Sequence, residues 1–137
     1  YRGLVGSEMC IRDRICCLRL EEIGIPNEIA HINGFDIAAH YNSKLIRVQV
    51  KARSVPDTRR KNVYMFTTSK GAKKKIALTR KECDVIGLVA IPEKQVIFMP
   101  VKTKVNVTAR VRISEYKKKN IALITWNQAM QVLNYSD

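Results

Sequence analysis

Hydrophobic and polar side chains alternate strictly along residues 45–54, and this is the clearest structural signal in the chain. Ile46, Val48, Val50 and Ala52 fall on one side of the alternation. The positions between them are polar or charged and hold Arg47, Gln49, Lys51 and Arg53. Because successive side chains of a β-strand point to opposite faces of a sheet, this pattern predicts a strand with one buried and one polar face.

The rest of the chain divides into short apolar segments separated by turn residues. Residues 85–91 are almost wholly apolar, which is typical of a strand buried on both faces. Gly24 and Pro26 follow a helical segment that ends at Ile23, a common way for a helix to stop. The other predicted elements are strands at 28–32, 35–41, 63–68, 95–101 and 107–114 and a helix at 125–134 with Thr125 as its N-cap. This order predicts a single α/β domain with one mixed sheet.

Length and composition fit that prediction and add a strong charge. The 137 residues are 46% hydrophobic and 27% charged, which is ordinary for a folded domain and excludes a mainly disordered chain. No apolar run is long enough to span a membrane, so no membrane partner is expected. The 25 Lys and Arg residues outnumber the 12 Asp and Glu residues, which gives a net charge of +13. A surplus of this size favours a polyanionic partner, most often a nucleic acid.

The N-terminal segment is expected not to belong to the natural protein. Residues 4–14, LVGSEMCIRDR, resemble codon by codon a translated adapter used to prepare DNA sequencing libraries. The segment also lacks the apolar stretch of a secretion signal. We therefore predict that residues 1–14 are non-native and that the functional domain comprises residues 15–137.

The remaining cysteines add little chemistry. Cys16 and Cys17 are adjacent and Cys83 stands alone, so they form no C-x-x-C pair, and no histidine has zinc-finger spacing. Thiols without a disulfide framework fit the reducing conditions of the cytoplasm, which is the expected location.

Candidate chemistry gathers on the alternating strand and the strand before it. A turn at residues 42–44 pairs these two strands antiparallel, so Asp36 can lie across from Gln49 and Lys51, which share one face. A carboxylate and an amide oxygen suit Mg²⁺, and the backbone carbonyl of Val50 is a possible third oxygen ligand. Such an ion activates a water and binds a phosphate, and Lys51 would orient that water or stabilise charge on the phosphate.

The same residues carry a family resemblance. Gly34-Phe35-Asp36-Ile37 followed by Ile46-Arg47-Val48-Gln49-Val50-Lys51 resembles the PD-(D/E)XK nuclease superfamily, in its Gln-x-Lys variant that includes group I intron homing endonuclease-like domains. The resemblance implies a restriction-endonuclease-like αβββαβ core. It also implies an endonuclease that uses Mg²⁺ or Mn²⁺ to hydrolyse DNA phosphodiester bonds and leaves 5′-phosphate ends. Asp36, Gln49 and Lys51 would be catalytic, and Asp36, Gln49 and Val50 would hold the metal.

An acidic residue on the first helix is a further expectation from the resemblance. Many members place a glutamate there, facing the metal. Asp13 lies near the expected place, but it falls inside the segment predicted to be non-native, so the role is not assigned to it. The natural first helix is expected to be truncated by that segment.

Basic residues on the alternating strand and in two loops are predicted to contact nucleic acid through its phosphates. They are Arg47, Arg53, Arg59, Arg60, Lys61, Lys73, Lys74 and Lys75. A solvated strand face and solvated loops would explain the same residues without function. The alternative function is accordingly a non-catalytic basic nucleic-acid-binding module on the same fold.

Two further expectations concern symmetry and histidine. A homodimer would place one site on each strand of a DNA duplex. His40 has the same strand parity as Asp36, so its side chain could point to the same face and assist a proton transfer.

Overall fold

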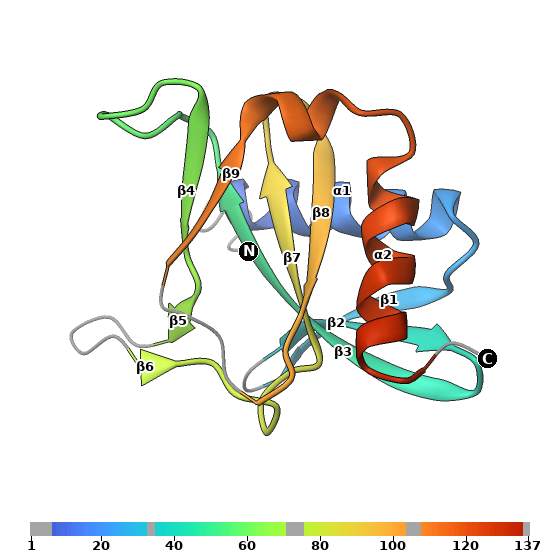
Figure 1. The fold of residues 1–137 in the computed structure, drawn as a ribbon. Helices are drawn as coiled ribbons and strands as arrows, with labels where there is room; N and C mark the ends of the chain where they lie inside the picture. The colour runs from blue at the N-terminus through green and yellow to red at the C-terminus, as the bar shows by residue number, and fades with distance from the viewer. Residues whose placement is uncertain (1–6, 33–34, 71–75, 104–107, 136–137) are drawn as a thin grey trace.

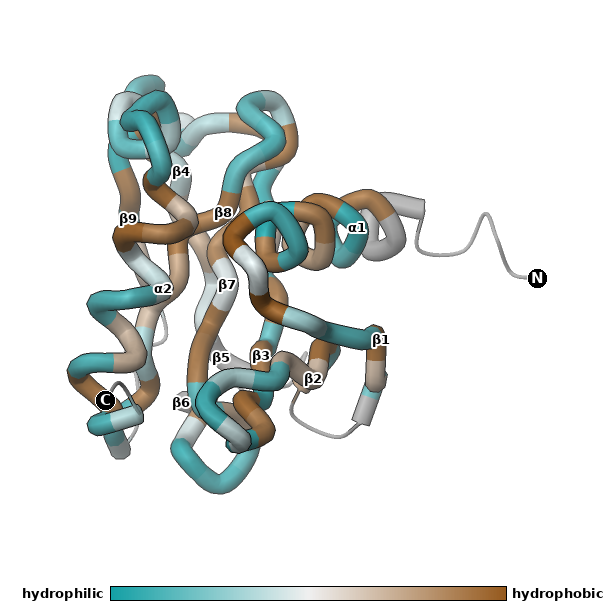
Figure 2. The backbone as a smooth tube through the Cα atoms, turned by 90° about the vertical axis from the view of Figure 1, so that its right-hand side faces the viewer, coloured by the Kyte–Doolittle hydropathy of each residue, from teal (hydrophilic) through white to brown (hydrophobic). Residues whose placement is uncertain are grey.

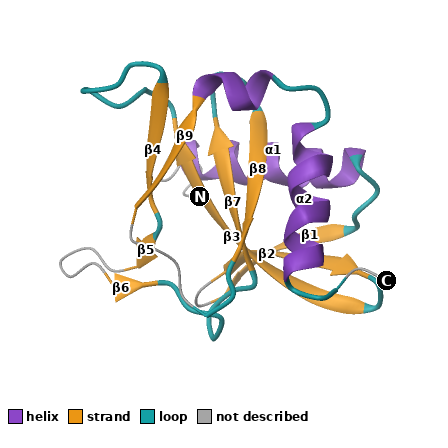
Figure 3. Ribbon diagram, in the orientation of Figure 1, coloured by secondary structure: helices purple, strands orange, loops and turns teal. Residues whose placement is uncertain are grey.

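The structure, a computed structural model, describes residues 7–32, 35–70, 76–103 and 108–135. Its centre is a five-stranded sheet in the order β1-β2-β3-β7-β8 (Figure 1; Figure 3). The strands of this sheet are β1 (Asn27–Ile32), β2 (Phe35–Tyr41), β3 (Lys44–Arg53), β7 (Val85–Ala90) and β8 (Gln95–Pro100). Around it lie α1 (Ser7–Glu22), β4 (Val63–Thr67), β5 (Ser69–Lys70), β6 (Ile76–Ala77), β9 (Thr108–Arg112), the 3₁₀ helix η2 (Ile113–Lys117) and α2 (Ile121–Val132).

The central sheet is mixed, as the sequence predicts. β1, β2 and β3 form an antiparallel meander, and Asn42 and Ser43 make the turn between β2 and β3 with φ of 49° and 63°. Positive φ at both turn residues matches the twist of a tight hairpin. β3 then pairs in parallel with β7, and β8 returns antiparallel beside β7. The predicted α/β fold class is therefore confirmed.

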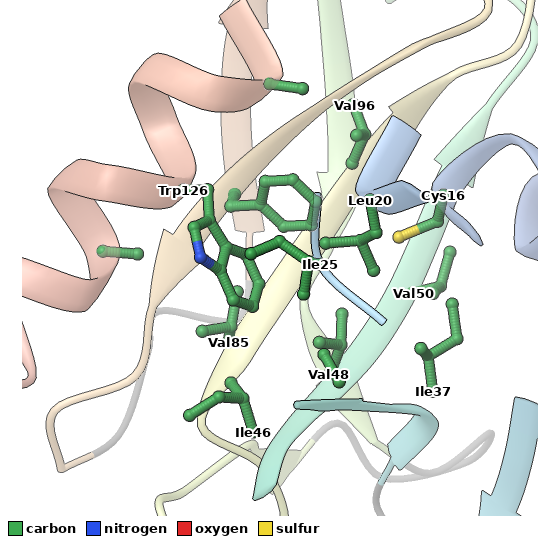
Figure 4. Packing of buried hydrophobic residues seen from close by; sticks show 14 of the residues in the cluster. Cys16, Leu20, Ile25, Ile37, Ile46, Val48, Val50, Val85, Val96 and Trp126 are labelled. Carbon is green, nitrogen blue, oxygen red and sulfur yellow. The ribbon is translucent and has the colours of Figure 1, made fainter. Parts of the chain in front are cut away.

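One face of the sheet packs against the two helices. Trp126 of α2 and Leu20 of α1 are fully buried there with Val48 and Val50 of β3, as Figure 4 shows. The rings of Trp126 and Phe98 meet edge to face, with centroids 5.1 Å apart. This is the apolar face of the alternating strand, so its buried side was predicted correctly.

The opposite face packs against a two-stranded ribbon. β4 and β9 pair antiparallel and lie side by side, in green and orange in Figure 1. Tyr64 and Phe66 of β4 join Tyr116 of η2 and Ile86 of β7 in a second apolar cluster. Figure 2 shows hydrophobic colour along much of β7 and hydrophilic colour in loops at both ends of the sheet. Gln49 of β3 pairs with Ile86 of β7, so the polar face of β3 is on the side of this second cluster. The polar side chains of β3 therefore face this ribbon rather than open solvent.

Two details differ from the sequence expectations. Between β3 and β7, the described residues contain β4 and the short strands β5 and β6 but no helix, so strands occupy the place of the second helix in an αβββαβ core. The last helix begins at Ile121 rather than after Thr125. The Thr125 hydroxyl donates to the Ile121 carbonyl at 2.8 Å and accepts from the Phe98 N–H, so Thr125 joins helix to strand and is no N-cap.

No helix within the described ranges has the length and apolar character needed to cross a membrane. The longest, α1, carries charged residues at intervals along its length. Cys16, Cys17 and Cys83 are free cysteines, of which Cys16 and Cys83 are buried and Cys17 is partly exposed.

Candidate active site

Asp36 lies where the hydrogen-bonded ladder between β2 and β3 ends. Pairing runs from the turn as far as Ile37 and Val48. One residue beyond, Asp36 Oδ2 accepts a hydrogen bond from the Val50 backbone N–H at 2.8 Å. The carboxylate thus replaces a main-chain acceptor, and it holds this end of the two strands together. Asp36 is only 8% exposed, so it is fixed in place.

Two oxygen-bearing groups of β3 belong to the same end of the β2–β3 ladder as Asp36. The N–H and C=O groups of one strand residue point to the same side of the strand, so the Val50 carbonyl points towards β2 as its N–H does. Continuation of the β2–β3 register places Gln49 opposite Asp36. Gln49 is partly buried, on the polar face of β3. A carboxylate, an amide and a main-chain carbonyl thus come from neighbouring positions.

Lys51 lies on the same face of β3 as Gln49 and is partly buried. Burial lowers the pKa of its ammonium group, and the nearby positive charge of Arg12 lowers this pKa further. The negative charge of Asp36 acts in the opposite direction and raises it. The structure therefore brings Lys51 within electrostatic reach of Asp36, as the sequence predicts, and makes its proton easier to release.

Helix α1 adds two charged residues that the sequence analysis left out of the site. Asp13 is 2% exposed, and its Oδ1 lies 3.6 Å from Arg12 Nε. Arg12 Nη2 lies 3.9 Å from Asp36 Oδ2. Burial raises the pKa of Asp13 to about 6, with Arg12 opposing the shift and Asp36 adding to it. The first helix thus contributes an acidic group beside Asp36.

His31 is a third residue that the sequence analysis did not place here. Its Nε2 lies 3.6 Å from Asp13 Oδ2, and its Nδ1 lies 3.8 Å from Asp36 Oδ1. The register of β1 against β2 shifts between Ile29 and Ile32, and His31 has φ of 49°. Such irregularities re-aim side chains, and here the ring is directed between two carboxylates.

The other histidine lies elsewhere. His40 Nε2 is 3.5 Å from Glu28 Oε1 on the exposed side of the β1–β2 hairpin. His40 and Asp36 are an even number of residues apart on one strand, so the sequence suggested that their side chains could share a face. In the structure, the Asp36 carboxylate instead accepts the hydrogen bond from Val50 at the end of the β2–β3 ladder. His40 is therefore not part of the site.

The donor set fits a hard cation only if amide and main-chain oxygens take part. Within the ranges that the structure describes, no three His, Cys, Asp or Glu side chains are arranged to hold a metal ion. Among the same residues, the buried Asp13 Oδ1 has no hydrogen-bond partner, so one carboxylate oxygen at the site is unsatisfied. Hard divalent cations accept carboxylate, amide and carbonyl oxygens together with several waters. The oxygens of Asp36, Gln49 and Val50 meet that requirement.

Comparison with known proteins identifies the family. A family model described as PD-(D/E)XK endonuclease matches residues 12–133, which is most of the chain. This chain belongs to the PD-(D/E)XK endonuclease family. The resemblance read from Asp36 and the Gln-x-Lys motif is thereby confirmed.

A solved structure supports the same fold. The bacterial homing endonuclease I-Ssp6803I has a TM-score of 0.54 to this chain at 11% sequence identity. The alignment covers 88% of this chain and 93% of that protein. At this identity the similarity concerns the fold alone. Comparison with curated proteins finds no match.

The residues predicted to contact DNA separate into four groups in this PD-(D/E)XK endonuclease. Arg47 is committed inside the protein, where its Nε and Nη2 donate to the two oxygens of Asp84 at 3.1 Å. Arg53, at the end of β3, is partly buried, whereas the loop residues Arg59, Arg60 and Lys61 are exposed. Lys73, Lys74 and Lys75 lie outside the described residues.

Arg47 is the clearest difference from the sequence prediction. Its guanidinium also donates to the carbonyls of Lys81 and Arg80 at 2.7 Å. The hydrogen bonds to Asp84 raise the pKa of Arg47, so its charge is held by the fold. With its donors used in this way, Arg47 has fewer of them left for a DNA phosphate, and its predicted contact with DNA stays a prediction.

Proposed function

We propose that this chain is a metal-dependent endonuclease that hydrolyses DNA phosphodiester bonds through Asp36, Gln49, Val50 and Lys51. The observation that carries the proposal is the hydrogen bond from the Val50 N–H to Asp36 Oδ2. It fixes a carboxylate at the one point where β2 and β3 stop pairing, next to a partly buried lysine. Family membership supports nuclease chemistry for this arrangement.

Asp36, Gln49 and Val50 would hold the metal, Mg²⁺ or Mn²⁺. A bound ion of this kind supplies an activated water and draws off negative charge from the phosphate. Asp36 keeps Oδ1 for the ion because its Oδ2 is engaged by Val50. Gln49 contributes an uncharged oxygen, which leaves the site less negative than one with two acids and so favours approach of a phosphate.

Lys51 acts beside the metal ligands. In the proposed mechanism its ammonium group hydrogen-bonds a phosphate oxygen or the attacking water, and this stabilises charge that develops in the transition state. The lowered pKa of Lys51 makes it a better proton donor to such an oxygen than an exposed lysine.

DNA is the proposed substrate. The net charge of +13 favours a polyanion, and the solved structure of similar fold is a homing endonuclease. Arg53, Lys61, Lys73, Lys74 and Lys75 remain proposed phosphate contacts. A homodimer is proposed as the cutting form, since one site cleaves one strand and a duplex has two. Light scattering with and without duplex DNA tests this point.

Residues 1–14 are proposed to be non-native, so Arg12 and Asp13 would stand at helix positions that other residues occupy in the natural protein. Sequencing the gene directly from unamplified source DNA tests this. A sequence other than LVGSEMCIRDR at residues 4–14 supports the proposal, and recovery of the same codons contradicts it.

A plasmid-nicking assay tests the function. The chain is incubated with supercoiled plasmid in Mg²⁺, in Mn²⁺ and in EDTA, beside Asp36→Ala and Lys51→Ala. We expect nicking only with metal, and its loss in both variants. His40→Ala is the control, because it removes an exposed ring outside the site and should leave nicking unchanged. Cleavage that survives Asp36→Ala contradicts the assignment, and DNA binding without cleavage in either metal supports the non-catalytic interpretation instead.

A further inference from the structure

A basic cleft lies beside the β4–β9 ribbon, and neither Asp36 nor Lys51 lines it. It has a volume of about 270 Å³ and is lined by Asp57, Arg59, Arg60 and Arg110. Arg59 and Arg60 come from the loop after β3, whereas Arg110 comes from β9, much later in the sequence. The cleft therefore exists only because β4 and β9 pair.

The loop that carries two of these arginines is held in place by its backbone. The Asp57 N–H donates to the Val63 carbonyl at 2.8 Å, and the Val63 N–H donates back to the Arg60 carbonyl at 3.0 Å. The Ile113 N–H donates to the Asn62 carbonyl at 2.9 Å, which ties the loop to the end of β9. A loop fixed in this way loses little further conformational entropy on binding a ligand.

Arg110 is directed outward by the ribbon. Its neighbours Ala109 and Val111 pack against the second apolar cluster, so strand alternation turns Arg110 to the exposed face. Met65 is its partner across the ribbon. Unlike Arg47 and Arg80, which bind Asp84, the side chains of Arg59, Arg60 and Arg110 form no ion pair with any described residue.

The chemistry of the lining selects an anion. Three guanidinium groups face one carboxylate, so the cleft is positive overall. Asp57 is occupied in part by the turn, where its Oδ1 lies 3.5 Å from the Arg59 backbone nitrogen. Planar guanidinium groups bind phosphate oxygens in pairs and hold their charge at any working pH.

We propose that this cleft binds a backbone phosphate of the DNA substrate, separate from the phosphate that is cleaved. The proposal rests on the proposed function, because it names a second contact for the same substrate. The ribbon covers the face of the sheet that bears Gln49 and Lys51, and the loop continues directly from β3. Because the loop with Arg59 and Arg60 follows the strand that bears Lys51, we infer that a duplex bound at Lys51 extends to the cleft, which helps to fix its position.

Duplex binding without cleavage tests the cleft. Fluorescence anisotropy is measured with a labelled duplex in EDTA, on Asp36→Ala protein, over a range of salt concentrations. Arg110→Gln should weaken binding roughly tenfold, the effect of losing one charge-assisted hydrogen-bonding group. It should also reduce the slope of log affinity against log salt by about one, whatever the DNA sequence.

Arg112→Gln is the matched control. Arg112 lies two residues further along β9, is exposed, and carries the same charge, but it does not line the cleft. We expect its affinity to stay within about twofold of the parent, since an exposed charge outside a contact acts only through screened long-range attraction. Equal losses of duplex affinity in the two variants, or no loss in either, contradict the proposed phosphate site. Absence of any duplex binding overturns it as well.

The design separates this proposal from the proposed function. Binding is measured without metal and without the Asp36 carboxylate, so it does not depend on catalysis. A plasmid that is never nicked, together with an Arg110-specific loss of affinity, rejects the nuclease chemistry and keeps the cleft. Asp36-dependent nicking together with equal effects of Arg110→Gln and Arg112→Gln rejects the cleft and keeps the nuclease.

Discussion

Asp36 and Asp84 are both buried carboxylates of the central sheet, with 8% and 4% of each residue exposed, yet their surroundings differ. Asp84, just before β7, accepts hydrogen bonds from the Arg47 N–H at 2.8 Å and from Arg47 Nε and Nη2 at 3.1 Å. Arg80 Nε adds another at 2.7 Å. Within the described part of the chain, Asp36 accepts one hydrogen bond at 2.8 Å, from Val50, and Arg12 and His31 lie 3.9 and 3.8 Å from its oxygens.

The difference separates a structural carboxylate from the one proposed to be reactive. The hydrogen bonds from Arg47 and Arg80 overcome the cost of burial and lower the pKa of Asp84, so its charge is neutralised within the fold. Beside Asp36, the buried Asp13 shows the opposite shift, with its pKa raised to about 6. A buried carboxylate with incomplete protein partners retains capacity for a cation or a substrate. Burial alone therefore does not distinguish the two carboxylates, whereas the number of hydrogen-bond donors around each one does, and it supports the proposal for Asp36.

The largest effect is expected on the structural side of this comparison. Asp84→Asn leaves Arg47 and Arg80 as partly buried cations without a counter-charge, which should lower the free energy of unfolding by about 4 kcal/mol. Urea denaturation measures this. Glu115→Gln is the control, since it breaks the exposed ion pair with Lys118 and should cost less than about 1 kcal/mol. Equal costs would mean that the Asp84 network adds no more stability than a surface pair.

Asp36→Asn should have the opposite balance of effects, with a small loss of stability and a large loss of nicking activity. The amide oxygen of Asn can still accept the hydrogen bond from Val50, so the fold should lose less than about 1 kcal/mol. The charged oxygen proposed for the metal is gone, so nicking should fall by about 100-fold or more, beyond the loss of an outer-sphere partner. A stable Asp36→Asn protein with parental nicking rates would place the reactive carboxylate elsewhere.

Local patterns were sufficient to predict most of the fold. The alternation at 45–54 located β3 and its buried face, and the apolar segment at 85–91 located β7. The start of α2 was missed because the Thr125 hydroxyl serves a strand contact inside the helix, and no local pattern reveals that. The helix instead begins after Asn120, which has the left-handed φ of 58°.

The site was predictable only where it depends on strand register. Asp36 and Lys51 follow from two adjacent strands and one short turn, so their proximity could be inferred. The bonding of Arg47 to Asp84 was not predicted, because Asp84 is 37 residues away in sequence. His31 was missed because its position depends on a shift of register in β1, although its hairpin pairing with β2 was a usable signal. Arg110 depends on the β4–β9 pairing, which no local motif predicts.

Asp13 gives a pH-dependent test, because it is a buried carboxylate beside Asp36 and its pKa is raised. Its pKa rises from the ordinary value of 3.8 to about 6 in the folded chain, so the folded chain binds this proton more tightly than the unfolded chain. The stability contributed by the protonated form is therefore present below about pH 4 and lost as pH rises towards 6. Asp13→Asn removes the ionisable group, so the variant does not lose this stability as pH rises. Its stability relative to the parent should rise by on the order of 2 kcal/mol between pH 4 and pH 7.

The matching measurement is urea unfolding of both proteins across that pH range. Glu22→Gln is a suitable control, because Glu22 is exposed on the same helix and pairs with Arg19. A difference between Asp13→Asn and the parent that stays constant with pH would show that Asp13 is ionised alike in the folded and unfolded chains.

The smallest expected effect concerns the two histidines, which form a matched pair. His31 and His40 each have a side chain that is 53% exposed and a ring nitrogen 3.5 to 3.8 Å from a carboxylate. Only the carboxylate of His31 belongs to the site. His31→Asn keeps a residue that tolerates φ of 49°, so stability should change by less than about 1 kcal/mol while nicking falls several-fold. His40→Asn should change neither, and equal nicking by the two variants would remove His31 from the site and leave Asp36 oriented by Val50 alone.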